Sequence, residues 1–244
     1  MRLFLVLTGL LMLSASIAGP GLAQDLSPAQ RQQLVKVLRE ALVQDPSILR
    51  DALAALQADD VHKQERVTRD VIAMIGPRLV DPADPVSGNP LGDVTIVEFF
   101  DTRCPYCRRM GPVLADLLRS DPKVRLVMKD LPVLGPTSQL ESRFLLAAQK
   151  QGGYFKLHDA VMQLGGASSR DSLRELADHL GLDGGRLARD VDDPAIKARL
   201  QTTNDTARQL GIEGTPAYVI GNRLIAGAAD LAELQRAVAE ARKR

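Results

Sequence analysis

The only cysteines among the 244 residues, Cys104 and Cys107, are separated by Pro105 and Tyr106. A structural zinc site needs four ligands, usually from two such pairs, and the sequence has no second pair. A covalent haem site would place a histidine directly after the second cysteine, where Arg108 stands. What remains is a dithiol that can close and open a short disulfide ring, so the spacing predicts redox chemistry.

The dithiol lies where a predicted strand, 94–100, gives way to a predicted helix, 105–119. Unpaired backbone N–H groups and the helix dipole favour the thiolate form of a cysteine at such a helix start, the position of Cys104. Cys107 lies one turn later and is expected to face inward. We therefore expect Cys104 to attack and Cys107 to resolve the mixed disulfide. Three neighbouring side chains add positive charge: Arg103, Arg108 and Arg109.

Glu98 interrupts the otherwise apolar strand, six residues before Cys104. If the carboxylate is buried, it can accept and return the proton of Cys107 during exchange. Lys129, at the end of the neighbouring predicted strand, could then hold Glu98 in its charged form. The alternative is that Glu98 points to solvent at a sheet edge. His158 has no metal-ligand spacing to another histidine and is expected to be a packed helical residue.

A second loop is marked by Gly214, Thr215 and Pro216, directly before a predicted strand at 217–220. A bond that precedes proline is the kind that adopts the cis form at modest cost. In a chain that carries the dithiol, we expect a cis Thr215–Pro216 bond in contact with Cys104. Such a loop offers backbone groups to an extended peptide. The expected substrate-binding residues are Pro105, Tyr106, Thr215 and Pro216.

Residues 1–23 have the pattern of a cleaved secretory signal peptide, with Arg2 before an apolar stretch and small residues at the cleavage site. The apolar stretch is shorter than the roughly 20 residues of a membrane anchor, which is the alternative. Loss of this segment leaves 30 Lys and Arg against 30 Asp and Glu, which argues against nucleic-acid binding. An exported dithiol protein is expected in an oxidising compartment, most simply a bacterial periplasm.

Three amphipathic helices are expected in residues 28–75, and Gly76 and Pro77 are expected to end the last one. So short a segment holds little core of its own, so its apolar stripes need a partner. The expected partner is another copy of the chain, and the alternative is that the helices fold back on their own domain. The stripes contain Leu34, Val37, Leu38, Leu42, Leu49, Leu53 and Leu56.

From about residue 79 the expected order is strand, helix, strand, an all-helical insertion at about 137–211, and then strand, strand, helix. Gly221 and Asn222 form a two-residue hairpin turn between the last two strands. The sequence therefore predicts three parts. These are a signal peptide at 1–23, a helical segment at 24–78 and an α/β domain at 79–244.

Several motifs together resemble the DsbA-like family of thioredoxin-fold proteins, over about residue 79 to the C-terminus. They are Phe99-Phe100-Asp101, Cys104-Pro105-Tyr106-Cys107, Lys129-Asp130-Leu131-Pro132 and Gly214-Thr215-Pro216. The resemblance implies a thioredoxin fold, in which Glu98 and Lys129 are similar to a buried acid–lysine pair. The N-terminal helices resemble those of the suppressor-of-copper-sensitivity protein C (ScsC) group, which implies a homo-oligomer, often a trimer. Thr215 before the proline is similar to the disulfide isomerases.

The leading hypothesis is a periplasmic thiol–disulfide oxidoreductase, an isomerase or oxidase without a cofactor. Its expected partners are exported proteins with cysteines and a membrane redox protein. The alternative is a copper-tolerance protein that holds Cu(I) between Cys104 and Cys107, since soft thiolates suit that ion. Only Met110 is close to the dithiol as a further soft ligand.

Overall fold

The computed structural model describes residues 26–243, so the expected signal peptide at 1–23 lies outside the described residues. The chain divides at Ala58 and Asp59 into two compact units. The first unit contains α1 (Pro28–Gln44) and the beginning of α2 (Ser47–Leu79). None of the helices in the described range combines the length and the apolar character needed to span a membrane.

The start of α1 is fixed by a capping box. The Ser27 hydroxyl accepts a hydrogen bond from the Gln30 N–H, and the Gln30 side chain accepts one from the Ser27 N–H. These two bonds satisfy N–H groups that have no partner within the helix. The helix therefore begins directly after Ser27.

α2 is one continuous helix where the sequence predicts a second and a third, and it runs on through Gly76 and Pro77, where the third was expected to end, to Leu79. Ile72, Ile75 and Leu79 are buried in a core with side chains of the central strands. Burial of such side chains stabilises by about 1.5–3 kcal/mol each. This outweighs the helix-propensity cost of about 1 kcal/mol for glycine and about 3 kcal/mol for proline. The compact α/β unit thus includes the end of α2, whereas the sequence placed its start at residue 79.

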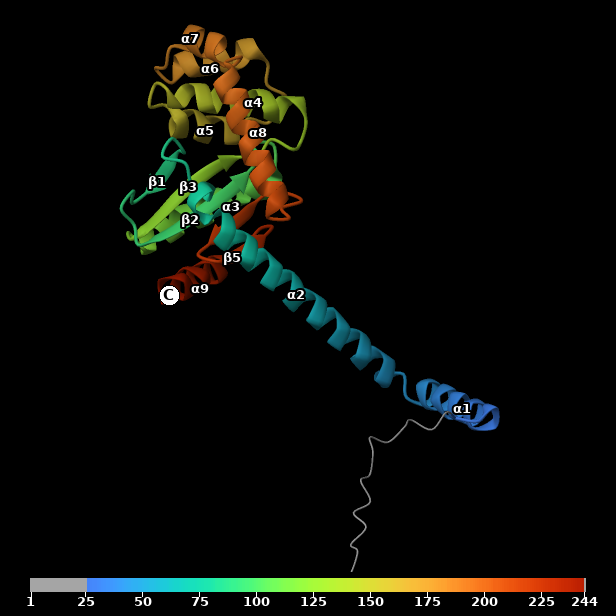
Figure 1. Cartoon of the computed structure of the whole chain (residues 1–244). Helices are drawn as coiled ribbons and strands as arrows, with labels where there is room; N and C mark the ends of the chain where they lie inside the picture. The colour runs from blue at the N-terminus through green and yellow to red at the C-terminus, as the bar shows by residue number, and fades with distance from the viewer. Residues whose placement is uncertain (1–25, 244) are drawn as a thin grey trace, which may run out of the picture. The chain divides into compact units, whose positions relative to one another are not determined.

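The second unit is built on a five-stranded sheet with the order β1-β3-β2-β4-β5 (Figure 1). The strands are β1 (Val86–Gly88), β2 (Val94–Phe100), β3 (Val124–Asp130), β4 (Ala217–Ile220) and β5 (Arg223–Ala226). β2 runs parallel to β3, and the other neighbouring pairs are antiparallel. β1 was not expected, because its three residues lie in a segment whose prolines and glycines predict turns.

Helices cover both faces of this sheet. α3 (Pro105–Ser120) and α9 (Leu231–Arg242) pack on the face that carries Ile96 and Leu126, and the end of α2 packs on the other face. The insertion between β3 and β4 forms a separate group of helices (Figure 1). It consists of α4 (Pro136–Gln149), α5 (Tyr154–Met162), α6 (Arg170–His179), α7 (Gly184–Asp190) and α8 (Pro194–Gln209). The predicted insertion is confirmed, and only α7 was missed, since seven residues are too few to show helical periodicity.

The end of α2 provides a test of this architecture. Ile75→Ala is expected to lower the free energy of unfolding of the α/β unit by about 2–5 kcal/mol, because it leaves a cavity in the core. The neighbouring Met74 is 66% exposed, so Met74→Ala is expected to change it by no more than about 0.5 kcal/mol. Urea unfolding followed by circular dichroism measures both. If Ile75→Ala changed the free energy of unfolding as little as Met74→Ala, this part of α2 would lie outside the core.

Candidate active site

Cys104 is the N-cap residue of α3, and Pro105 stands in the first turn of the helix. The Cys104 side chain makes no capping hydrogen bond. Its Sγ instead donates a hydrogen bond of 3.1 Å to the backbone carbonyl oxygen of Thr215. The Thr215–Pro216 peptide bond is cis. The cis bond and the contact with Cys104 that the sequence predicts are both confirmed.

The two loops meet because of the way β2 and β4 pair. Phe99, near the end of β2, lies opposite Ala217, the first residue of β4. In an antiparallel pair, the segment after one strand and the segment before the other lie at the same edge of the sheet. The dithiol follows β2 and the Thr215–Pro216 loop precedes β4, so residues 111 positions apart become neighbours.

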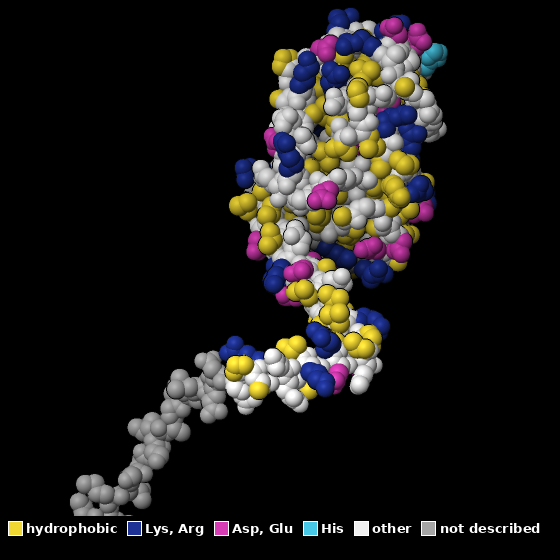
Figure 2. Space-filling model, turned by 90° about the vertical axis from the view of Figure 1, so that its right-hand side faces the viewer, with side chains coloured by type: hydrophobic (Ala, Val, Ile, Leu, Met, Phe, Trp, Pro, Cys, Tyr) yellow, Lys and Arg dark blue, Asp and Glu magenta, His cyan; other side chains and the backbone are white. Residues whose placement is uncertain are grey.

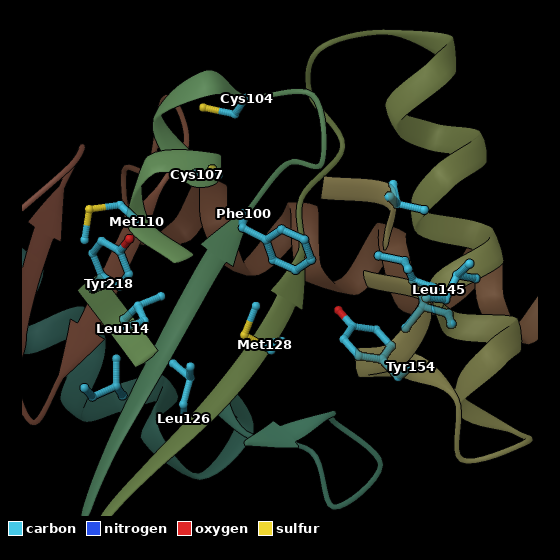
Figure 3. Close-up of a cluster of buried hydrophobic side chains, with 14 of the residues drawn as sticks. Phe100, Cys104, Cys107, Met110, Leu114, Leu126, Met128, Leu145, Tyr154 and Tyr218 are labelled. Atoms are coloured by element: carbon cyan, nitrogen blue, oxygen red, sulfur yellow. The ribbon is translucent and has the colours of Figure 1, made fainter. Parts of the chain in front are cut away.

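The two cysteines differ in their surroundings, although both are buried. Figure 3 shows Cys104 at the start of the helix and Cys107 one turn further in, toward Met110 and Tyr218. Burial raises the pKa of the Cys107 thiol, so this cysteine keeps its proton at neutral pH. On the outside, Tyr106 is 53% exposed, and the Arg109 guanidinium lies 4.2 Å from the centre of its ring.

Glu98 lies in the interior, which agrees with the expected buried carboxylate and not with the alternative of a solvent-facing sheet edge. Its residue surface is only 3% exposed, and its Oε1 accepts a hydrogen bond of 3.3 Å from the Tyr218 hydroxyl. Loss of hydration raises the pKa of Glu98 to about 7, although His158 and the hydrogen bond from Tyr218 oppose this effect. A carboxyl group with such a pKa can bind or release a proton near neutral pH.

Lys129 does not pair with Glu98, which corrects the expectation from the sequence. The register of β2 and β3 places Glu98 opposite Met128, and Lys129 opposite Phe99. Because side chains alternate along a strand, Lys129 lies on the other face of the sheet. There its Nζ lies 2.5 Å from a carboxylate oxygen of Asp84. A shift of one residue in register exchanges the two faces, and the sequence alone does not fix it.

The role of Asp101 was not predicted from the sequence. Asp101 is fully buried. Its Oδ1 accepts a hydrogen bond of 2.7 Å from the Arg103 N–H, and its Oδ2 accepts one of 2.9 Å from the Leu134 N–H. The carboxylate therefore joins the dithiol loop to the loop after β3. A single aspartate after a strand carries no sequence signal that identifies such a distant partner.

Two of the arginines near the dithiol bind backbone carbonyl groups of the helical insertion. Arg103 donates a hydrogen bond of 2.7 Å to Gly166, and Arg108 donates one of 2.8 Å to Leu164. They thus fasten the insertion to the dithiol loop. In residues 26–243, no group of three or more His, Cys, Asp or Glu side chains could hold a metal ion. The Cu(I) alternative stays a prediction.

A dithiol at the head of a helix, beside a cis-proline loop and on a sheet with a helical insertion, defines a thioredoxin-like redox protein. Residues 95–239 match the model of the DSBA-like thioredoxin domain family. This match covers more than half of the chain, and the chain therefore belongs to that family. The predicted thioredoxin fold with an all-helical insertion is thereby confirmed.

Solved structures support this assignment. A thioredoxin-like oxidoreductase from Silicibacter pomeroyi DSS-3 is 42% identical, and the match covers 68% of this chain and 96% of that one with a TM-score of 0.65. The thiol-disulfide exchange protein α-DsbA2 from Wolbachia pipientis is 28% identical, with coverage of 73% and 97% and a TM-score of 0.67. Proteus mirabilis ScsC is 28% identical, with coverage of 89% and 97% and a TM-score of 0.64. The resemblance to the DsbA-like and ScsC proteins is confirmed.

Among curated proteins, the Na(+)/H(+) antiporter NhaA 1 of Salinispora arenicola is 30% identical over 178 residues. The match covers 72% of this chain and 27% of the antiporter. The chain thus spans about a quarter of the length of the first curated relatives that it matches.

The raised pKa of Glu98 predicts how stability depends on pH. Between the ordinary value of 4.5 and about 7, the folded protein binds a proton that the unfolded chain releases. The contribution of Glu98 to the free energy of unfolding therefore falls as the pH rises through this range, by about 3 kcal/mol in total. Glu98→Gln removes this loss, so the reduced variant is expected to be more stable than the reduced parent at pH 8. At pH 4 the two are expected to be alike. Denaturant unfolding across this range tests the prediction, and a constant difference from pH 4 to 8 would contradict it.

Proposed function

We propose that this protein is a periplasmic thiol–disulfide oxidoreductase that acts on exported proteins with cysteines. The observation that carries the proposal is the contact of 3.1 Å between Cys104 Sγ and the Thr215 carbonyl oxygen, beside the cis-proline. A substrate bound to Cys104 through a disulfide would lie along this loop. The loop's backbone groups could then pair with the substrate chain as with an added strand.

The dithiol reduces a substrate disulfide in two exchanges. The Cys104 thiolate attacks one sulfur of the substrate disulfide, and the other sulfur leaves as a thiolate. Cys107 then gives its proton to Glu98 and attacks the Cys104 sulfur. This closes the Cys104–Cys107 disulfide and releases the second substrate sulfur as a thiolate, so the substrate gains two electrons. The same steps in reverse oxidise a substrate dithiol, and a membrane redox partner resets the cysteine pair.

The surface around Cys104 suits chains that are not yet folded. Tyr106, Val133 and Leu134 are about half exposed although they are large and apolar. The hydrogen bond from the Leu134 N–H to Asp101 holds Val133 and Leu134 near the dithiol loop. Unfolded exported proteins expose apolar side chains together with their cysteines. Together with Pro105, Thr215 and Pro216, this surface is the proposed substrate-binding site.

Whether the protein mainly oxidises substrates or rearranges their disulfides depends on its oligomeric state. Seven apolar side chains of α1 and the start of α2 are 41–57% exposed, and Figure 2 shows hydrophobic side chains on the helices that follow the grey segment. They are Leu34, Val37, Leu38, Leu42, Leu49, Leu53 and Leu56. Burial of each side chain against other copies of the chain would stabilise the assembly by about 1.5–3 kcal/mol. A trimer, in keeping with the likeness to ScsC, would present several dithiols to one substrate and so favour isomerisation.

Single cysteine variants test the assigned roles. Cys107→Ser is expected to accumulate a mixed disulfide with a disulfide-containing substrate, because nothing resolves it. Cys104→Ser is expected to form none and to lose exchange activity. Non-reducing electrophoresis and mass spectrometry of the trapped species measure both. A mixed disulfide on Cys107, or exchange that persists in Cys104→Ser, would reverse or refute the assignment.

The assembly is tested in the full chain without its signal peptide. A double substitution, Leu38→Glu with Leu53→Glu, is expected to give a monomer that still exchanges disulfides but shuffles scrambled substrates poorly. Lys36→Glu, at an exposed polar position of α1, is the matched control and should leave the assembly intact. Light scattering measures the molar mass, and thus the number of copies, for the parent and for each variant. A parent protein that is monomeric at micromolar concentration would refute the assembly and the argument for isomerisation.

A further inference from the structure

A second group of buried polar side chains lies at the end of β3 and takes no part in the steps above. Asp130, at the end of β3, accepts a hydrogen bond of 2.7 Å from the Tyr154 hydroxyl through its Oδ2. Its Oδ1 is buried and has no partner within the described part of the protein. The hydroxyl oxygen of Ser138 is buried and unpaired in the same way, whereas the Ser142 hydroxyl lies close enough to Asp130 to lower the pKa of that carboxyl group. Buried polar atoms without a protein partner are the usual environment of an internal water molecule.

His158 lies beside this group, and its side chain is 13% exposed. Its Nδ1 lies 3.0 Å from Oδ1 of Asp159, whose side chain is 73% exposed. Its Nε2 is buried and has no partner among the described residues. The ring packs edge-on against Phe100, with 5.1 Å between the ring centres, and lies nearly parallel to Tyr154 at 6.1 Å. One ring nitrogen thus meets an exposed carboxylate, and the other is enclosed by the protein.

Phe100, against which His158 packs, connects His158 to the strand that carries Glu98. Glu98 and Phe100 point to the same face of β2, and Phe100 lies opposite Asp130 on β3. Figure 3 shows Phe100 between Cys107 and Tyr218 on one side and Tyr154 on the other. Burial raises the pKa of Asp130 to about 6, and the positive charge that His158 carries when it is protonated lowers the pKa of both Asp130 and Glu98 against the effect of burial.

Of the charged and titratable groups near Glu98 in the described part of the chain, only His158 can carry the proton of Glu98 toward solvent. Arg199 of α8 acts on Asp130 and binds Asp84, and its guanidinium stays charged. The hydroxyls of Tyr154 and Tyr218 have raised pKa values, so they hold their protons. Lys129 lies on the other face of the sheet. An imidazole can take a proton at one nitrogen and release one at the other.

We infer that His158 conducts the proton of Glu98 to and from solvent during disulfide exchange. This inference rests on the proposed function, because it concerns the same dithiol. The Cys107 thiol gives its proton to the Glu98 carboxylate, and the carboxylic acid passes it to Nε2 through an internal water. Nδ1 then releases its own proton to Asp159 or to solvent. Each transfer moves one proton and no electrons. His158 does not touch the reacting sulfur atoms and acts on them only through Glu98.

The His158→Phe variant tests this inference, since it keeps a ring against Phe100 and Tyr154 but has no ring nitrogen. The rate at which Cys107 resolves a mixed disulfide on Cys104 is expected to fall about 100-fold at pH 7, the lower end of what general acid–base catalysis contributes. Formation of the mixed disulfide, measured in a Cys107→Ser background, should not change. His179→Phe, on α6, is the matched control. Rapid acid quench followed by mass spectrometry measures both steps.

Two further measurements separate proton conduction from a purely structural role. In a Glu98→Gln background, His158→Phe should have no further effect on resolution, because the proton of Cys107 then no longer passes through residue 98. In His158→Gly, added imidazole should restore the rate in proportion to its concentration. An unimpaired His158→Phe variant would overturn the inference alone, as would a defect that persists in Glu98→Gln and is not rescued by imidazole. A wild-type protein without any disulfide exchange would overturn the proposed function as well.

Discussion

The site depends on the pairing of β2 with β4. This pairing brings the Thr215 carbonyl to Cys104 and the Tyr218 hydroxyl to Glu98. Glu98 belongs to β2 and Cys104 follows it. Their partners, Tyr218 and Thr215, belong to β4 and precede it, respectively. Without this pairing, Cys104 would lack the loop beside it, and one side of β2 would be open to water.

The sheet separates two kinds of electrostatic environment. On one face, Lys129 and Arg199 neutralise Asp84 in direct ion pairs. On the other face, the buried carboxyl groups of Glu98 and Asp130 have hydroxyl partners and no direct salt bridge in the described structure. An acid that is buried without a cation keeps its proton to a higher pH than one that is paired. The carboxyl groups on the face that carries the dithiol can therefore hold protons near neutral pH.

The sequence predicted the features whose signals are local. The dithiol, the junction of strand and helix at Cys104 and the loop at Pro216 are each contained in a few consecutive residues. The features that it missed depend on distant parts of the chain. The register of β2 and β3 decides the face of Lys129, and the core behind the sheet decides that α2 continues past Pro77. Asp101 is significant only because the backbone of Leu134 comes to it.

The order of the strands along the chain also has a consequence for synthesis. β2 is followed by α3, β3 and the whole helical insertion before its other neighbour, β4, is made. A growing chain therefore presents Cys104 and Cys107 well before Thr215 and Tyr218 exist. Contacts between such distant segments form late in folding, because a long loop must first be closed. The nascent chain thus carries an ordinary pair of thiols beside a hydrated Glu98, and they gain their special environment only when the sheet is completed.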